Sequence, residues 1–199
     1  LVFTYINGFH DTANSIATVV ATKVLSPGQA VLLAAGTNLI GAFMGTAVAA
    51  TIASGLINAG VIDMSSQLLI CALLAAIVWN LITWWLGLPS SSSHALIGAL
   101  VGAALAASDN NFASVIWVEG GWLKGHGVIP KVIIPMVLSP GAGFIISFFL
   151  MGALYALLAW FANRQGWSRR FGRTPFVNSF FGKAQILSAS TMGVAHGMN

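Results

Sequence analysis

Residues 7 to 15 place an acid, a histidine and two asparagines inside a segment that is otherwise apolar. The segment extends from residue 1 to about residue 24, which is long enough to cross a bilayer as a helix. A carboxylate at membrane depth costs at least ~2.5 kcal/mol, so Asp11 needs partners that offset this cost. On a helix, four polar residues would share one face at i, i+4, i+7 and i+11: Asn7, Asp11, Asn14 and Thr18.

Two readings of this face compete. Asparagine and threonine side chains often hydrogen-bond neighbouring transmembrane helices, which would explain the amides and hydroxyls alone. That reading does not explain His10 and Asp11, because an ionisable residue inside a membrane is functional by default. We therefore expect a substrate or ion site. Gly8 would permit local unwinding, so we expect a broken first helix whose free carbonyls can bind a cation.

A second polar cluster follows Pro89, where four serines precede His94. One helix N-cap would explain one serine, but not four in succession beside apolar sequence. Hydroxyls next to the free N–H groups and positive dipole end of a helix N-terminus make an anion site. The favoured ligand is a tetrahedral oxyanion, either phosphate or sulfate. His94 would bind the anion or hydrogen-bond nearby, and both roles stay open.

Composition assigns the chain to the membrane. It is 57% hydrophobic and 6% charged, against about 25% charged residues in a soluble domain. The net charge of +4 does not indicate nucleic-acid binding, because half of the basic residues gather in one short stretch. The positive-inside rule places that stretch in the cytoplasm. It contains Arg164, Arg169, Arg170 and Arg173.

Further apolar stretches cover residues of about 30–54, 68–88, 95–107, 131–161 and 176 onward. The stretch at 95–107 is short for a full span, so we expect residues 68–107 to form a helical hairpin with the serines at its tip.

Residues 6–10 and 195–199 share a faint polar–Gly–apolar–polar order, each near the start of an apolar segment. Many transporters consist of two inverted repeats with the site between broken helices. The expected fold is therefore all-α, a polytopic transmembrane helical bundle with inverted repeats. Residues 1–161 would form the first repeat, 162–175 a basic cytoplasmic loop and 176–199 the start of the second repeat. Further segments are expected after Asn199.

Three motifs resemble the signatures of the inorganic phosphate transporter (PiT) family, most closely its bacterial low-affinity members. They are residues 7–14, 87–94 and 195–199, and their order is that of the family. The resemblance implies a secondary transporter of the bacterial inner membrane, usually a homodimer, that imports phosphate with a coupling cation. It implies no cofactor and no enzyme activity.

By motif position, the resemblance also implies roles for single residues. Phosphate would be bound by Ser91, Ser92, Ser93, Asn7 and Asp11. The coupling ion would be bound by Asp11, Asn14, Asn38, His10 and Asn199. The second half-site would begin with His196 and Asn199.

The coupling ion stays open between H⁺ and Na⁺. Asn38 stands where sodium-coupled animal members of the family carry an acid. With His10, this resembles the bacterial proton-coupled branch, which carries phosphate as a neutral complex with a divalent metal. Asp11 and unwound carbonyls would suit Na⁺ equally well.

The expected mechanism is alternating access, in which cation entry neutralises Asp11 and the loaded site then turns to the other face of the membrane. One alternative is an intramembrane serine hydrolase that uses a serine of the tip with His10 or His196. The adjacent Ser93 and His94 have poor geometry for a nucleophile and its base. The other alternative is a passive anion channel.

Overall fold

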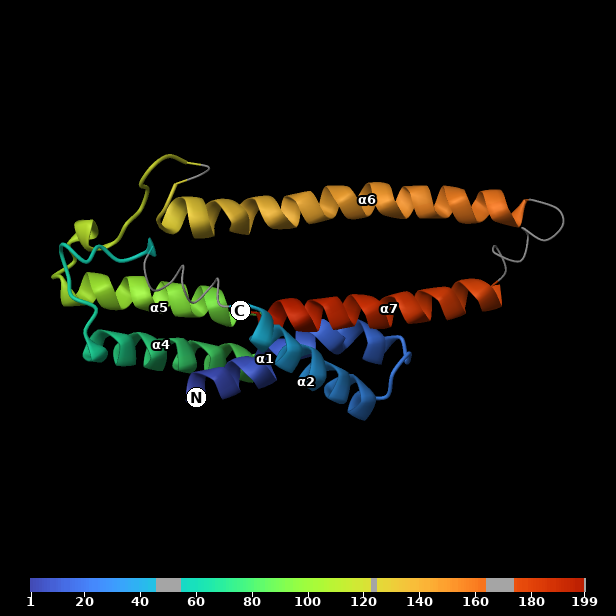
Figure 1. Ribbon diagram of the computed structural model, residues 1–199, viewed down its shortest axis with the longest axis horizontal. Coiled ribbons are helices and arrows are strands. Elements are labelled where there is room, and N and C mark those ends of the chain that lie inside the picture. The colour runs from blue at the N-terminus through green and yellow to red at the C-terminus, as the bar shows by residue number, and fades with distance from the viewer. Residues whose placement is uncertain (46–54, 123–124, 164–173, 199) are drawn as a thin grey trace.

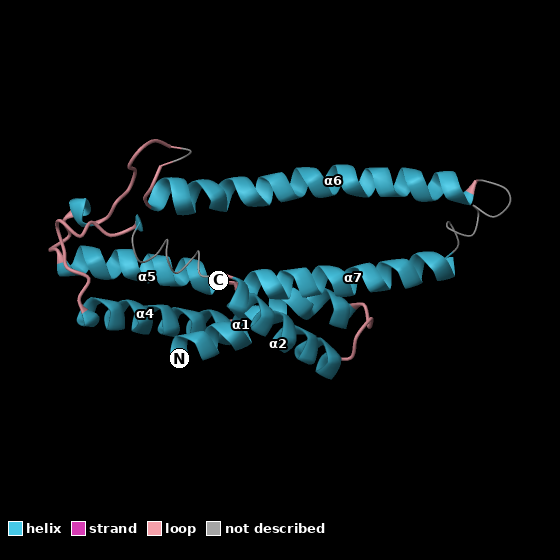
Figure 2. Cartoon of the chain, in the orientation of Figure 1, coloured by secondary structure: helices cyan, strands magenta, loops and turns pink. Residues whose placement is uncertain are grey.

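The computed structural model describes residues 1–45, 55–122, 125–163 and 174–198, which form helices joined by turns and loops (Figures 1 and 2). The long helices are α1 (Val2–Ala21), α2 (Pro27–Met44), α4 (Ser66–Trp85), α5 (Ser92–Ala107), α6 (Ile134–Ala162) and α7 (Thr174–Gly197). A 3₁₀ turn, η1 (Phe112–Ser114), and a π-helical turn, η2 (Ile129–Ile133), precede α6. Within these ranges the only β pairing is two isolated bridges between loop residues. The predicted all-α class is confirmed.

Local sequence explains where the helices begin. Ser26 caps α2 and forms a capping box with Gln29, while Pro27 occupies the first helical position, where its missing N–H costs nothing. Ser65 caps α4, because its hydroxyl accepts the N–H of Leu68 at 3.2 Å.

The expected break in the first helix is wrong. α1 is continuous from Val2 to Ala21 and passes through Gly8 without interruption. Glycine inside a helix costs only about 1 kcal/mol relative to alanine. Unwinding in apolar surroundings would instead leave backbone N–H and C=O groups without partners, which costs more. The carbonyls around Gly8 are therefore in helical backbone rather than freed for a cation.

The chain reverses between Trp85 and Ser92, so that α4 and α5 pack together as an antiparallel pair (Figure 1). A buried apolar cluster lies at the end of the pair away from the serines. It joins the two helices to the loops that flank them, through Leu56, Ile57, Leu68, Ala72, Leu100, Ala104, Val115 and Val128. These loops therefore fix the base of the pair, while the serines lie at its opposite end.

The helices α1, α2 and α7 form a second packed unit, with Val19, Ala30 and Ala189 at its core. Glycines allow α2 and α7 to approach closely. A Cβ atom on Gly41 would collide with the carbonyl oxygen of Val194, and one on Gly197 would collide with the carbonyl oxygen of Asn38. This close packing holds the last turn of α7 near the start of α5 (Figure 1).

Much of the surface is apolar, as a bilayer requires. Two helical stretches, Ser66–Trp85 and Ile129–Ala162, are long and apolar enough to cross a membrane. No residue of α6 is buried against the rest of the chain. The basic loop predicted at 162–175 falls largely on residues 164–173, which lie outside the described residues.

Replacing Gly41 with alanine should destabilise the packing of α2 on α7. The added methyl group has no room, and overpacking costs ~1–3 kcal/mol. Gly36→Ala is the matched control on the same helix, because nothing lies within 4 Å of its Cβ position. Thermal unfolding in detergent should show a lower melting temperature for Gly41→Ala and an equal or higher one for Gly36→Ala. Equal melting temperatures for both variants would contradict the close approach.

Candidate functional site

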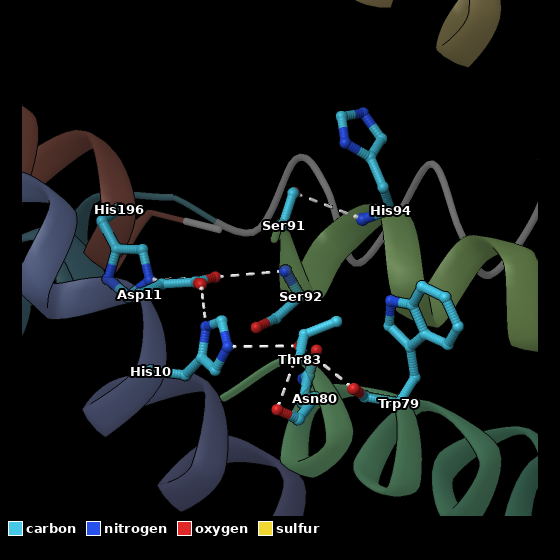
Figure 3. Close-up of polar contacts among 9 residues, drawn as sticks. All are labelled: His10, Asp11, Trp79, Asn80, Thr83, Ser91, Ser92, His94 and His196. Atoms are coloured by element: carbon cyan, nitrogen blue, oxygen red, sulfur yellow. Dashed lines mark hydrogen bonds and ion pairs between the residues drawn. The ribbon is translucent and has the colours of Figure 1, made fainter. Parts of the chain in front are cut away.

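Asp11 lies at the centre of a cluster of polar groups from α1, α4, α5 and α7 (Figure 3). Its side chain is 12% exposed, and each carboxylate oxygen accepts one hydrogen bond. The Nδ1 atom of His10 lies 2.9 Å from Oδ1, and the backbone N–H of Ser92 donates to Oδ2 at 3.2 Å. The acid is therefore held by donors from its own helix and from the start of α5.

The start of α5 can hold an acid because its first N–H groups have no partner inside the helix. Ser91 is the N-cap, and its hydroxyl accepts the N–H of His94 at 3.4 Å. Ser92 is the first helical residue, so its N–H is free to donate to Asp11. The positive end of the helix dipole adds to this attraction. One of the four serines is thus an ordinary cap.

Below this contact, two fully buried side chains have no hydrogen-bond partner within the described chain. They are the carboxamide of Asn80 on α4 and the hydroxyl of Ser92, each with no exposed surface. Figure 3 shows the Ser92 hydroxyl turned toward the space between His10 and Thr83. Buried polar groups are normally hydrogen-bonded, and those that are not need an explanation such as a ligand or a buried water.

Thr83 extends the cluster on the α4 side. Its Oγ1 lies 3.3 Å from Nε2 of His10 and also lies within hydrogen-bonding distance of the carbonyl oxygens of Trp79 and Asn80. Sequence reasoning did not assign Asn80 or Thr83 to the site. Their spacing of three residues in an apolar span could have indicated that they belong to the site. It places them on the same helix face as the buried small residues Ala72 and Ala76.

His196 joins the cluster from α7. Its Nδ1 lies 2.5 Å from Oδ1 of Asn38, and its Nε2 lies 3.9 Å from Oδ2 of Asp11. The Asn38 amide nitrogen donates to the carbonyl oxygen of Ala34 at 2.8 Å. Residues far apart in the sequence therefore meet at Asp11.

The remaining predicted residues lie around this centre. Asn7 lines a groove of 780 Å³ together with Asn38 and His196. Ser91 and His94 line another groove of 480 Å³ on the hairpin, and the His94 ring points away from Asp11 (Figure 3).

Three other predicted residues lie away from the contacts at Asp11 or outside the described part of the chain. Ser93 is half-buried and Asn14 is exposed, so their roles stay predictions. Asn199 lies outside the described residues.

The donor set suits an oxyanion together with a positive charge that neutralises Asp11. The described residues contain no group of three or more histidine, cysteine or acidic side chains that could hold a metal ion. They do contain a helix N-terminus, hydroxyls and a carboxamide, which donate to oxyanions, and one acid that must be neutralised when an anion binds beside it.

Comparison with known proteins gives concordant matches. A family model described as "Phosphate transporter family" matches residues 7–199. The chain is 47% identical over 199 residues to a "Probable low-affinity inorganic phosphate transporter" of Streptomyces halstedii, covering all of this chain and 82% of that protein. Proteins of the same name from Mycobacterium tuberculosis (strain CDC 1551 / Oshkosh) and Bacillus subtilis are 45% and 41% identical, and the chain spans only 42% and 53% of their lengths.

A solved structure described as "The sodium-dependent phosphate transporter" superimposes with a TM-score of 0.65 at 24% identity. The match covers 98% of this chain and 52% of that chain, and it supports the fold. The family model also spans nearly the whole chain. The chain belongs to the phosphate transporter family, which is a family of transporters and not of enzymes.

Proposed function

We propose that this chain forms half of the transport site of a secondary active symporter that imports inorganic phosphate across the bacterial inner membrane. The observation that carries the proposal is the hydrogen bond from the Ser92 N–H to Asp11, which joins the acid of α1 to a helix N-terminus at the hairpin tip. The names of the bacterial relatives support phosphate as the substrate.

In this proposal, phosphate is bound at the tip of the α4–α5 pair. The N-terminal N–H groups of α5 and the hydroxyls at its first turn provide donors for several oxygens of a tetrahedral anion. Asp11 faces the same place, so it must be neutralised before an anion can bind there. The binding residues are Ser91, Ser92, Ser93, Asn7 and Asp11.

A coupling cation neutralises Asp11. Its binding residues in this proposal are Asp11, Asn14, Asn38, His10 and Asn199. Of these, His10 contacts the Asp11 carboxylate directly, and Asn38 contacts it through His196. Phosphate then travels with the cation, either free or as a complex with a divalent metal that is part of the cargo.

Alternating access follows from an inverted-repeat architecture. Residues 1–161 form the first repeat, 162–175 the cytoplasmic loop and 176–199 the first part of the second repeat, which begins the second half-site with His196 and Asn199. The packing of α7 on α1 and α2 supports this arrangement, because it brings a helix of the second repeat to the acid of the first. The functional unit is a homodimer.

Asp11→Asn should abolish coupled phosphate uptake, because an amide cannot alternate between a charged and a neutralised state. Uptake of labelled phosphate into cells should fall to the level of cells without the transporter. Asp63→Asn is the matched control, since Asp63 is exposed in the loop before α4. Wild-type uptake by Asp11→Asn would contradict the proposal. Accumulation that never exceeds the external concentration in the wild type would indicate a passive channel instead.

Ser92→Pro should weaken phosphate uptake more than Ser92→Val does. Proline removes the N–H that donates to Asp11, yet it is tolerated at the first position of a helix, and the extended backbone of Ser91 suits a following proline. Valine removes the hydroxyl and adds similar bulk but keeps the N–H. A hydrogen bond to a charged group is worth ~1.5–3 kcal/mol, so we expect about tenfold or more between the two variants. Equal uptake kinetics would show that the backbone donor is dispensable.

A further inference from the structure

The tautomer of His196 is fixed by its neighbour on α2. The Asn38 amide nitrogen donates to the Ala34 carbonyl oxygen at 2.8 Å, so the amide oxygen must be the atom that faces His196. The opposite orientation would place two acceptor oxygens against each other. Nδ1 of His196 therefore carries a hydrogen and donates to Asn38. In the neutral ring, the other nitrogen, Nε2, then has only a lone pair.

That lone pair faces the acid. Nε2 of His196 is buried, has no hydrogen-bond partner among the described residues and lies 3.9 Å from Oδ2 of Asp11. Two acceptors thus face each other in a largely buried place, where the side chains of His196 and Asp11 are 21% and 12% exposed. This arrangement costs free energy until a positive charge or a proton joins them.

His10, the other histidine beside Asp11, has no such unpartnered ring nitrogen among the described contacts. His10 donates from Nδ1 to Oδ1 of the carboxylate, and its Nε2 is within reach of the Thr83 hydroxyl at 3.3 Å. The Thr83 hydroxyl can donate to this nitrogen when its hydrogen turns away from the carbonyl oxygens of Trp79 and Asn80, so the neutral ring has a partner at both nitrogens. Within the described part of this cluster, the buried ring nitrogen without a hydrogen-bond partner is Nε2 of His196.

We propose that His196 carries the coupling proton, and that protonation of Nε2 links α7 to α1 through an ion pair with Asp11. The proposal rests on the symport function proposed above and specifies H⁺ as the coupling cation. The proton adds to the Nε2 lone pair, the ring gains one positive charge, and Asp11 is neutralised. Release of the proton to the other side of the membrane restores the neutral ring and breaks the link.

The same contacts disfavour Na⁺ at this place. Hard cations prefer oxygen ligands, whereas the side chain that faces Oδ2 of Asp11 presents a nitrogen. Both carboxylate oxygens already accept N–H groups, from His10 and Ser92.

Few other charges face His196 within the described residues. Asp11 and His10 face it from α1, whereas its contact on α2, Asn38, is uncharged. Lys183 is the other ionisable residue described on α7, but it precedes His196 by 13 residues, about 20 Å along the helix. From the hairpin, the nearby Ser92 is uncharged. Asp11 is therefore the acidic side chain that lies within ion-pairing distance of His196 among the described residues.

The test uses the intact transporter in proteoliposomes, with labelled phosphate and a pH indicator. One arm imposes a pH gradient, one imposes a sodium gradient, and one measures exchange of internal for external phosphate without any gradient. His196→Gln keeps an N–H donor near Asp11 but cannot titrate. His126→Gln makes the same change at an exposed residue of the loop before η2.

The wild type and His126→Gln should accumulate phosphate under the pH gradient and take up protons with it. His196→Gln should lose that accumulation and the proton movement, and its exchange should weaken as well, because Asp11 then keeps the negative charge that opposes phosphate. Asn38→Leu provides a second variant, because it frees the His196 tautomer so that a neutral ring can donate to Asp11. It should lower the ratio of protons to phosphate without removing the histidine.

A slower His196→Gln with an unchanged proton-to-phosphate ratio would overturn the proposal and leave His196 a structural role. Accumulation driven by sodium alone, with no proton movement, would also overturn it but would leave phosphate symport intact. Absence of phosphate exchange in the wild type would instead contradict the proposed function itself.

Discussion

The buried carboxylate of Asp11 is the constraint on which the other contacts depend. A charge that leaves water must be met by hydrogen-bond donors or opposite charge, or it becomes protonated. Here the donors come from a neighbouring histidine and from the first turn of α5. A new helix, α5, begins opposite Asp11, at the serine-rich turn where the chain reverses after α4.

The sequence was sufficient to predict the helices, because apolar spans, caps and prolines are local signals. α1, α4, α5 and α7 begin or end within a few residues of the predicted boundaries, and the meeting of Asp11 with the serine tip was expected. The continuity of α1 through Gly8 was not predictable in this way. A glycine shows that unwinding is permitted, while the cost of unpaired backbone groups decides whether it occurs.

The missed parts of the site depend on contacts between distant segments. Asn80 and Thr83 are ordinary polar residues of an apolar span until α5 covers one and His10 approaches the other. The link from Asn38 to His196 joins residues 158 positions apart and requires the glycine-mediated packing of α2 on α7. No periodicity within one helix contains that information, because the partners are set by which faces pack together.

In the proposed mechanism, the placement of one acid beside an anion site makes coupling obligatory. An oxyanion entering near Ser92 meets the N–H groups of α5 but also the negative charge of Asp11. Like charges a few ångströms apart repel by several kcal/mol at an effective dielectric constant near 20, so the anion binds tightly only after a positive charge has neutralised the acid. Linkage then makes the effect reciprocal: phosphate raises the affinity for the cation as much as the cation raises the affinity for phosphate. A site with serines alone would bind phosphate without this dependence and could not use a cation gradient.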